Sequence, residues 1–521
     1  MGIVWSVLLR MGQTAIECSS TMVVGFLIAA VMRQMLGAAG TRRLFGGTGL
    51  GGLFRAWVIG SLLPVCSLGV IPVARELARA GVPSATILAF VLAAPQLNPL
   101  SFLYGLTLSE PIVIIGFVVA TMTIAIAGGE IWKYGFETPA DTQPPGDEPT
   151  PAPGLKRLLA VFVNASRESV GSAMGYIFLG IAFTGLLAGL LPHGILSNTM
   201  RHDDWLSPAL MTLIGLPAYS GVLPGMMRIG LIFEHGNSVG AGFLLFELGV
   251  GTNLGLIVWI LMQYGWRRAL LWLLLVVVLA LGIAYAIEYP LYFANEEASH
   301  THAFDDWTSP FVSISEGDPA IVGKKLLDKI EILEPLALAL LLLLWLTGGL
   351  LTWLDRGGQV ESWLNRVAPP RQSPLSRWDV EVPGPVLGVV ALLGLVVFSV
   401  VALYIYYPDS KQALDEIVRV RAEVHSAVRG GKKEEAIRQI QHWDLLTRKL
   451  QVGVFLRTGK LEPAASKAAE ELRERLEELR DALLNNQLDQ AKGLLMPLER
   501  AYRECRQVYQ PSSHPVVEQP T

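Results

Sequence analysis

Two short segments bracketed by prolines hold the residues of this chain that are best suited to bind a solute. The first contains, in order, Pro64, Cys66, Ser67, Gly69 and Pro72, and the second contains Pro217, Tyr219, Ser220, Gly221 and Pro224. Proline removes a helical hydrogen bond and clashes with the preceding turn, so each segment should interrupt a helix. Unwound backbone would then present carbonyls and amides beside a thiol or a hydroxyl, as in many transporter sites. A structural kink that holds an inert cysteine is the alternative interpretation.

An asparagine follows each of these segments at the same spacing, which indicates an internal repeat. Asn98 follows Gly81 as Asn253 follows Gly236, and Gln96 lies beside the first of these asparagines. Because both the order and the spacing agree, we favour a repeat over a chance match of residues that are common in membrane helices. The amide side chains are expected either to cap the broken helices or to contact a solute, and both interpretations stay open.

Glu247 lies near the middle of an apolar stretch that reads Phe-Leu-Leu-Phe-Glu-Leu-Gly. A carboxylate is costly in lipid, so we expect this one to face the protein interior or water and to mark an ion or proton path. The alternative is a protonated carboxyl group that is hydrogen-bonded to a neighbouring helix.

A further cluster combines imidazole and carboxylate groups, which suit zinc and similar ions. Its members are His300, His302, Asp305 and Asp306. The alternative interpretation is a surface loop in which histidine and aspartate are merely frequent.

Other motifs predict no cofactor. Residues 47–52 read Gly-Thr-Gly-Leu-Gly-Gly, but the dinucleotide fingerprint needs a preceding strand and a βαβ unit, and this stretch lies between apolar segments. The three cysteines, Cys18, Cys66 and Cys505, are too far apart in sequence for a CxxC or a zinc knuckle. We also find no ATP-binding loop and no catalytic constellation in the apolar segments, so we expect neither an enzyme nor a nucleic-acid partner.

The elements that must position these residues are membrane helices. The 521 residues are 52% hydrophobic and only 17% charged, with a mean hydropathy of +0.44. The apolar residues come in runs of about 20, the length that crosses a ~30 Å hydrocarbon core. We expect uninterrupted spans near 15–37, 83–107, 111–132, 170–191, 238–262, 267–289, 330–354 and 383–407. The segments 57–80 and 206–232, which contain the prolines, are also apolar but interrupted.

The positions of lysine and arginine predict the orientation of these spans. Before the C-terminal region, basic residues concentrate in clusters: Arg33, Arg42, Arg43 and Arg55; Lys133, Lys156, Arg157 and Arg167; Arg267 and Arg268; and Arg356, Arg366, Arg371 and Arg377. If 57–80 and 206–232 are re-entrant hairpins, every cluster falls on the cytoplasmic side. Each half then has three crossing helices and one hairpin. An odd number of crossings gives the halves opposite orientations, which is the inverted-repeat plan of many secondary transporters.

The composition divides the chain into successive regions. We expect a first permease repeat at 1–135, a Pro-rich linker at 136–154, a second repeat at 155–290, an exposed acidic His/Asp loop at 291–325, two additional transmembrane helices at 326–407, a soluble helical domain at 408–510 and a disordered tail at 511–521. In the helical domain, Gly430-Gly431 and Asn485-Asn486 separate what we expect to be two helical hairpins. Because two spans lie between them, this domain and the acidic loop should share one side of the membrane.

The first hairpin and the stretch after it carry a family resemblance. Leu63 through Pro72, then Gly81, Ala89-Phe90 and Ala94-Pro95-x-x-Asn98-Pro99, are close to the pattern P-x-C-S-C-G-x-x-P followed by A-F-x-x-A-x-P-x-x-N-P. This pattern resembles the prokaryotic predicted-permease family that includes the organoarsenical efflux permease ArsP, and Pro217 through Asn253 is similar to the degenerate second copy. The resemblance covers about 15–290 and implies transport and a paired-repeat membrane fold. The second cysteine of the pattern is Leu68 here, so the resemblance supports a permease more than an arsenical substrate.

Together these observations predict an all-α integral membrane permease of the cell inner membrane or plasma membrane. It would move a small solute, a metalloid or metal-related species being one candidate, by alternating access around the paired hairpins. Its expected partners are the lipid bilayer, a small-molecule or ion solute, and a protein that binds the C-terminal helical domain. The alternative is a non-transporting membrane scaffold or sensor in which that helical domain is the working part.

Overall fold

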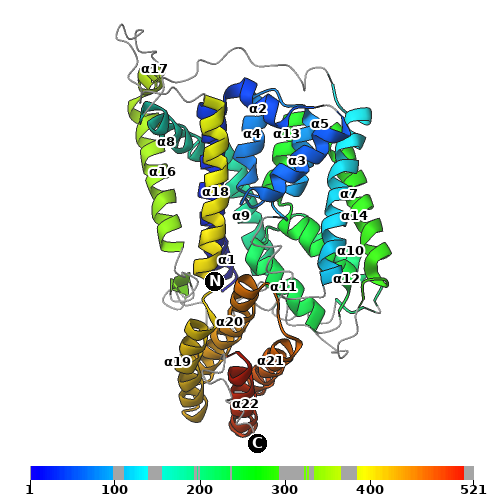
Figure 1. Cartoon of the computed structure of the whole chain (residues 1–521), viewed down its shortest axis with the longest axis vertical. Coiled ribbons are helices and arrows are strands. Elements are labelled where there is room, and N and C mark those ends of the chain that lie inside the picture. Colours follow the sequence, from blue (N-terminus) through cyan, green and yellow to red (C-terminus); the bar gives the residue numbers. More distant parts are fainter. Residues whose placement is uncertain are drawn as a thin grey trace, which may run out of the picture. The chain divides into compact units, whose positions relative to one another are not determined.

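The computed structural model describes residues 2–47, 49–97, 111–138, 155–192, 200–202, 204–234, 237–292, 334–364 and 384–509, with the isolated residues 196, 322, 323, 326 and 327. Within these residues the secondary structure is helical, apart from one isolated antiparallel bridge between Arg201 and Asn237. The predicted all-helical class is therefore confirmed for the described part of the chain. The chain divides into two compact units, Met1–Ser399 and Val400–Thr521, whose helices are labelled in Figure 1.

The first unit contains two halves and a C-terminal addition. The first half consists of α1 (Gly2–Val31), η1 (Met32–Leu36), α2 (Gly37–Phe45), α3 (Leu50–Leu62), α4 (Val70–Arg79), α5 (Ser84–Ala93) and α7 (Pro111–Gly135). The second half consists of α8 (Leu155–Ser169), α9 (Ser172–Leu190), α10 (Ser207–Gly215), α11 (Val222–Glu234), α12 (Val239–Leu244), η3 (Leu245–Val250), α13 (Leu254–Tyr264) and α14 (Trp266–Glu288). The addition consists of α16 (Glu334–Leu354), α17 (Gln359–Leu364) and α18 (Gly384–Tyr406).

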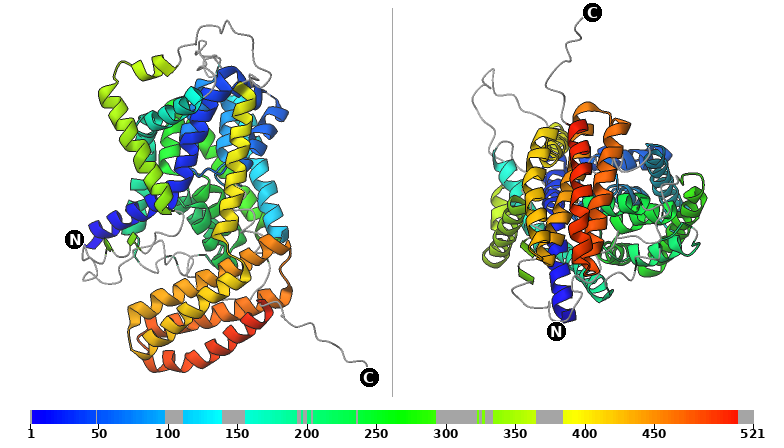
Figure 2. Two further views of the ribbon diagram at one scale, coloured as in Figure 1. Left: turned by 60° about the vertical axis from the view of Figure 1, so that its left-hand side comes forward. Right: turned by 90° about the horizontal axis from the view of Figure 1, so that it is seen from below.

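The two halves share part of their helix order, although α2 in the first half and α8 in the second have no counterpart. A long helix, α1 or α9, precedes a pair of short helices, α3 and α4 or α10 and α11. An interrupted segment follows and leads to another long helix, α7 or α14. Helices α1 and α9 pack against each other, so the halves meet along them (Figures 1 and 2).

The interruptions predicted from the prolines are present. Pro64 lies in the gap between α3 and α4, and Pro217 lies in the gap between α10 and α11. Pro72 and Pro224 lie instead in the first turns of α4 and α11. A proline costs no helical hydrogen bond there, because the first amides of a helix have no partner within it.

Several helices of the first unit have the length and hydropathy of membrane spans. Among the described residues, five qualify: Ile3–Phe45, Ile112–Gly135, Ser172–Leu190, Trp266–Glu288 and Glu334–Leu354. The exposed side chains of α14 and α16 are mainly leucine, valine and tryptophan, which suits contact with lipid. The prediction of a protein with several membrane spans is therefore confirmed.

Two of the predicted uninterrupted spans differ in the structure. The segment 238–262 is a pair of helices, Val239–Val250 and Leu254–Tyr264, bent by 61°. The bend arises because Asn253 has extended backbone and its side chain accepts a hydrogen bond from the Leu256 amide at 3.0 Å, which starts a new helix. In the segment 83–107, α5 ends at Ala93, and residues 98–110 lie outside the described part.

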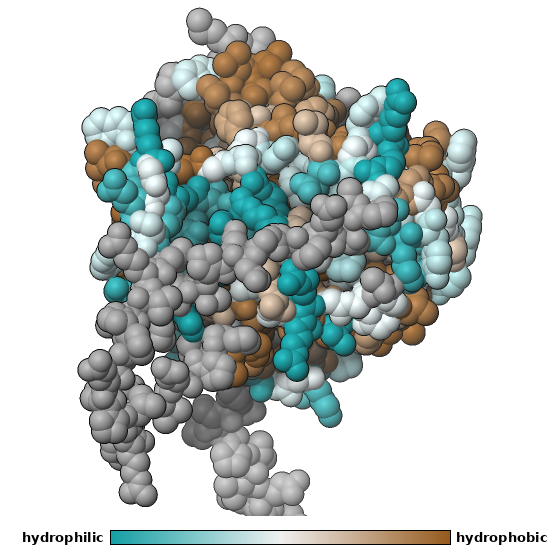
Figure 3. All heavy atoms as spheres, turned by 90° about the horizontal axis from the view of Figure 1, so that it is seen from above, coloured by the Kyte–Doolittle hydropathy of each residue, from teal (hydrophilic) through white to brown (hydrophobic). Residues whose placement is uncertain are grey.

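Contacts between helices link described basic residues of the first unit, among them Arg42, Arg79, Arg167 and Arg268, along one face. The linking pairs are Arg42 with Ala80 (2.8 Å), Ser84 with Glu137 (2.9 Å), Arg268 with Phe136 (3.1 Å), Arg79 with Glu168 (3.1 Å) and Arg167 with Asp355 (3.0 Å). Figure 3 shows hydrophilic side chains gathered on this face. We call it the basic face.

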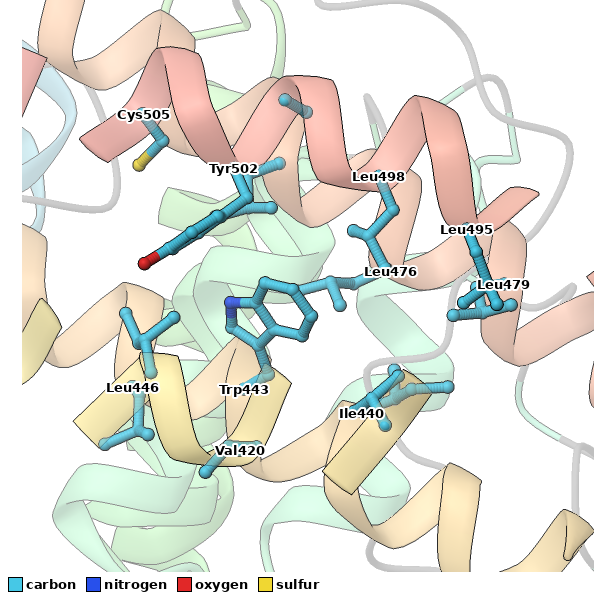
Figure 4. Packing of buried hydrophobic residues seen from close by; sticks show 14 of the residues in the cluster. Val420, Ile440, Trp443, Leu446, Leu476, Leu479, Leu495, Leu498, Tyr502 and Cys505 are labelled. Carbon is cyan, nitrogen blue, oxygen red and sulfur yellow. The ribbon is translucent and has the colours of Figure 1, made fainter. Parts of the chain in front are cut away.

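The second unit is a bundle of four helices, α19 (Ser410–Arg429), α20 (Lys433–Thr458), α21 (Pro463–Leu484) and α22 (Leu488–Tyr509). Its core centres on Trp443, whose ring meets that of Tyr502 edge-on at 5.7 Å (Figure 4). Gly431 and Asn486 adopt positive φ angles at the two helix turns, and Lys433 bonds to the Asn486 side chain at 2.8 Å. The two expected helical hairpins are thus present and joined at their turns.

The second unit begins earlier than the boundary expected at 408. Its first residues are the last turns of α18, since the Tyr404 hydroxyl donates to the Leu456 carbonyl at 2.9 Å. Arg457 donates to the Tyr407 carbonyl at 2.9 Å. These bonds hold residues 404–407 against α20 within the second unit, which composition alone did not indicate.

Candidate functional site

The first break is the gap between α3 and α4, residues 63–69. Cys66 is only 1% exposed and Ser67 is fully buried. The Cys66 thiol accepts a hydrogen bond from the Gly69 amide at 3.3 Å, and the Cys66 carbonyl accepts one from the Val70 amide at 2.8 Å. The thiol therefore closes the turn from which α4 starts.

Two glycines allow α1 to lie directly against this break. A Cβ atom added to Gly25 would overlap the Gly69 carbonyl oxygen, and one added to Gly69 would lie 2.6 Å from the Thr21 carbonyl oxygen. Real Cβ atoms do not approach backbone atoms so closely, so backbone contact here requires glycine on both sides.

The second break is the gap between α10 and α11, residues 216–221. The Tyr219 amide donates to the Thr184 hydroxyl on α9 at 2.7 Å, and the Ser220 amide donates to the Gly249 carbonyl at 2.8 Å. The hydroxyl of Thr252 donates to the carbonyl of Leu216 at 2.9 Å. The unwound backbone of this break is thus paired within protein, as interrupted helices at membrane depth require.

Arg228 adds a charge to the second break. It lies on α11, is 5% exposed and donates from Nη1 to the Ser220 hydroxyl at 2.7 Å. A charged residue in an apolar run marks a functional region by default, so the sequence carried a signal for Arg228, which is absent from the candidates predicted above.

A third break, residues 251–253, separates η3 from α13. Asn253 is fully buried at this point, and a Cβ atom on Gly180 of α9 would lie 2.6 Å from its Oδ1 atom. Gly180 therefore lets α9 pack closely against the third break, just as Gly25 lets α1 pack closely against the first break.

The breaks meet between the two halves. The Ser67 hydroxyl faces the Thr252 carbonyl at 3.4 Å, and the Tyr219 hydroxyl lies beside the Cys66 thiol. The amide of Gln96 donates to the Glu247 carbonyl at 2.9 Å. Residues more than 150 positions apart in sequence are thereby joined in one buried cluster.

Glu247 lies in the π-helical turn η3 and is 1% exposed. The Gln96 side chain also bonds to its carboxyl group, and the ring of Phe246 beside it packs 5.8 Å from that of Phe117. The Oε2 atom of Glu247 and the Nδ2 atom of Asn253 have no hydrogen-bond partner among the described residues. Unpaired buried polar atoms are costly, so a proton, water or solute is expected to engage them.

A second thiol lies beside the first break. Cys18 on α1 places its sulfur 3.2 Å from the Met22 sulfur, and the Met22 Cα lies 3.5 Å from the Cβ position of Gly69. Cys18 is close enough to Cys66 and Tyr219 to interact with both electrostatically. No local motif could reveal this neighbour, because it is supplied by a different helix.

The remaining candidates lie outside the described residues. They are Asn98 and the His/Asp cluster His300, His302, Asp305 and Asp306. Within the described part of the chain, no group of three or more histidine, cysteine or acidic side chains could hold a metal ion.

Membrane-length helices and interrupted helices that meet in the interior define a multi-pass membrane protein of the permease class. The chain belongs to the ArsP_1 family, described as predicted permeases, which it matches over residues 6–289. That match covers both halves of the first unit. No curated protein and no solved structure matches the chain significantly.

Proposed function

We propose that the protein is a secondary permease whose solute passes between its two halves at the meeting point of the breaks. The observation that carries the proposal is this meeting point: the Cys66 thiol contacts Tyr219, and Ser67 contacts Thr252, across the boundary between the halves. Family membership supports transport rather than catalysis. The shared part of the helix order, a long helix, two short helices around a proline break and a second long helix, supports an inverted repeat that alternates access to the breaks.

The side chains at the first break favour a solute with affinity for sulfur. Near the first break, Cys66 bonds to the Gly69 amide, and Cys18 of the adjacent helix α1 contacts the Met22 thioether, so two thiols and a thioether come from this region. Soft sulfur donors prefer soft metal ions and metalloids to hard cations. Cys18 thus supplies the second thiol that is missing from the sequence motif, where Leu68 stands.

Glu247 is the proposed coupling group. Its carboxyl is buried, bonded to Gln96 of the other half and incompletely paired, so gaining or losing a proton would change the contact between the halves. With the basic face on the cytoplasmic side of an inner or plasma membrane, a proton gradient would be available to drive the cycle.

Solute flux into sealed proteoliposomes tests the proposal. The solutes are a trivalent arsenical, a monovalent soft metal ion and a small inorganic anion. We expect flux of a thiophilic solute that falls at least about tenfold in Cys66→Ser, since an alcohol binds soft ions far less well than a thiolate. Cys505→Ser is the matched control, because Cys505 is buried in the second unit, and it should leave flux unchanged.

A second candidate function comes from the second unit, which has its own core and can act as a binding module. In that case the membrane part would be an anchor for a scaffold or sensor. A chain that ends after residue 409 separates the two functions. Flux that survives this deletion supports the permease, and the absence of flux from every form of the protein supports the scaffold.

A further inference from the structure

The breaks are buried, so a solute needs a route to them that the structure holds closed. Cys66 is 1% exposed, and Ser67 and Gln96 are fully buried. A permease must open such a site to one side at a time, and the elements that move are expected to be held by contacts that can break.

A cavity of about 200 Å³ lies on the basic face, lined by Arg75, Ala78 and Arg79 of α4 and by Gln263 of α13. These two helices start from the first and third breaks. The lining residues of α4 lie in its second half, so the cavity is about 8–14 Å along the helix from the first break. It therefore has the position of a vestibule above the proposed solute site.

One carboxylate fixes the α4 wall of this vestibule. Glu168 of α8 pairs through Oε1 with Arg75 Nε at 3.4 Å and through Oε2 with Arg79 Nη1 at 3.1 Å. Arg75 and Arg79 are one helical turn apart, so Glu168 bridges two successive turns of α4. Its side chain is only 14% exposed, so the surrounding water screens these ion pairs less than it would on an open surface.

Helix α8 is itself firmly held. Arg167 pairs with Asp355 at the end of α16 at 3.0 Å and with Glu361 of α17 at 2.5 Å. Helix α8 also packs against α1. Glu168 therefore connects α4, which starts from the first break, to a part of the unit that the breaks do not include.

We propose that Glu168 is a gate residue: its ion pairs with Arg75 and Arg79 hold α4 in place and close the route from the basic face to Cys66. Release of these pairs lets α4 move away from α13, which extends the vestibule to the first break. The role of the gate in transport depends on the function proposed above, but the gate itself can be measured without any solute.

The experiment measures the rate at which a membrane-impermeant thiol reagent, added on the basic face, labels Cys66 in reconstituted protein. Cys18 and Cys505 are replaced by serine so that Cys66 alone reacts. Glu168→Gln keeps the shape of the side chain and removes its charge. We expect labelling to be faster by roughly tenfold, because the open form gains population.

Two further variants separate a gate from a general structural role. Arg79→Glu should also accelerate labelling, and the exchanged pair of charges (Arg75→Glu and Arg79→Glu with Glu168→Arg) should return it toward the original rate. The matched control is Glu130→Gln, which breaks the pair with Lys133 within α7. It should not change the labelling rate.

Equal rates in Glu168→Gln, Glu130→Gln and the parent protein would overturn the gate, even if flux is normal. Acceleration in Glu168→Gln that the exchanged pair does not reverse would also overturn it, since damage to the fold would then explain the result. Faster, reversible labelling without flux of any solute would leave the gate standing and contradict the proposed function instead.

Discussion

The first and second breaks are built from similar sequences but are held in different ways. The first is held mainly by close backbone packing, with Gly25 of α1 directly on Gly69. The second is held by the hydrogen bond that the Tyr219 amide donates to the Thr184 hydroxyl and by the one that Arg228 donates to the Ser220 hydroxyl. The comparison indicates that the two breaks have different roles. The second break is held rigidly by its hydrogen bonds, and the first break presents the side chains that can react with a solute.

The side chains in the middle of the two breaks also differ in the roles for which they are suited. Cys66 lies at the tip of the first break, and Tyr219, which contacts it, lies at the tip of the second. A thiol can bind a soft solute, whereas a buried phenol is better suited to orient its partner. We therefore expect loss of the Cys66 thiol to affect mainly transport and loss of the Ser220 hydroxyl to affect mainly stability.

The largest effect should come from filling the contact between α1 and the first break. Gly25→Ala places a Cβ atom on the Gly69 carbonyl, which neither backbone can avoid without moving. We expect a cost of about 1–3 kcal/mol or more and loss of flux. Yield of monodisperse protein and flux in proteoliposomes measure the two effects.

The control for this substitution is Gly175→Ala on α9. An added Cβ atom there has no atom within 4 Å, so stability and flux should stay near those of the parent. Equal behaviour of the two variants would show that the close packing of the first break is unimportant.

A second effect, on flux and its pH dependence, should come from changing Glu247, which contacts Gln96 of the other half. Glu247→Gln keeps the shape of the side chain but removes the titratable proton. We expect lower flux and loss of its pH dependence, with normal expression. Unchanged flux and an unchanged pH profile in a well-expressed variant would rule out proton coupling through Glu247.

The smallest effect separates the two serines. Ser220→Ala removes the acceptor of a 2.7 Å bond from a buried arginine, so we expect a loss of about 1–3 kcal/mol in stability. Ser67→Ala removes only a 3.4 Å contact and should cost clearly less. The thermal unfolding midpoints of the two variants are compared in the same detergent. A lower midpoint for Ser67→Ala than for Ser220→Ala would contradict the rigid structural role assigned to the second break.

Local sequence patterns predicted much of this architecture. Pro64 and Pro217 mark real gaps because proline acts on its own backbone, and the buried position of Glu247 follows from the apolar residues around it. The four helices of the second unit follow from their apolar periodicity and from the turns at Gly431 and Asn486.

Other features depend on contacts that no local pattern encodes. Cys18 joins the first break because α1 packs there, and two glycines on different segments permit that approach. The third break was missed although Asn253 is a strong helix N-cap, since the apolar run around it resembles one continuous span. The role of Glu168 follows only from its ion pairs with Arg75 and Arg79, which the structure shows and the sequence does not.

The most direct test of the central claim is a reversible cross-link between the first and second breaks. Ser67→Cys and Ser220→Cys are combined, an oxidant or a short thiol cross-linker is applied, and flux is measured before and after reduction. Each single variant serves as the control for reaction with Cys66. We predict an efficient cross-link that stops flux in the double variant, is slowed by solute and is reversed by reduction. Failure to cross-link, or full flux through the cross-linked protein, would contradict a solute path between the breaks.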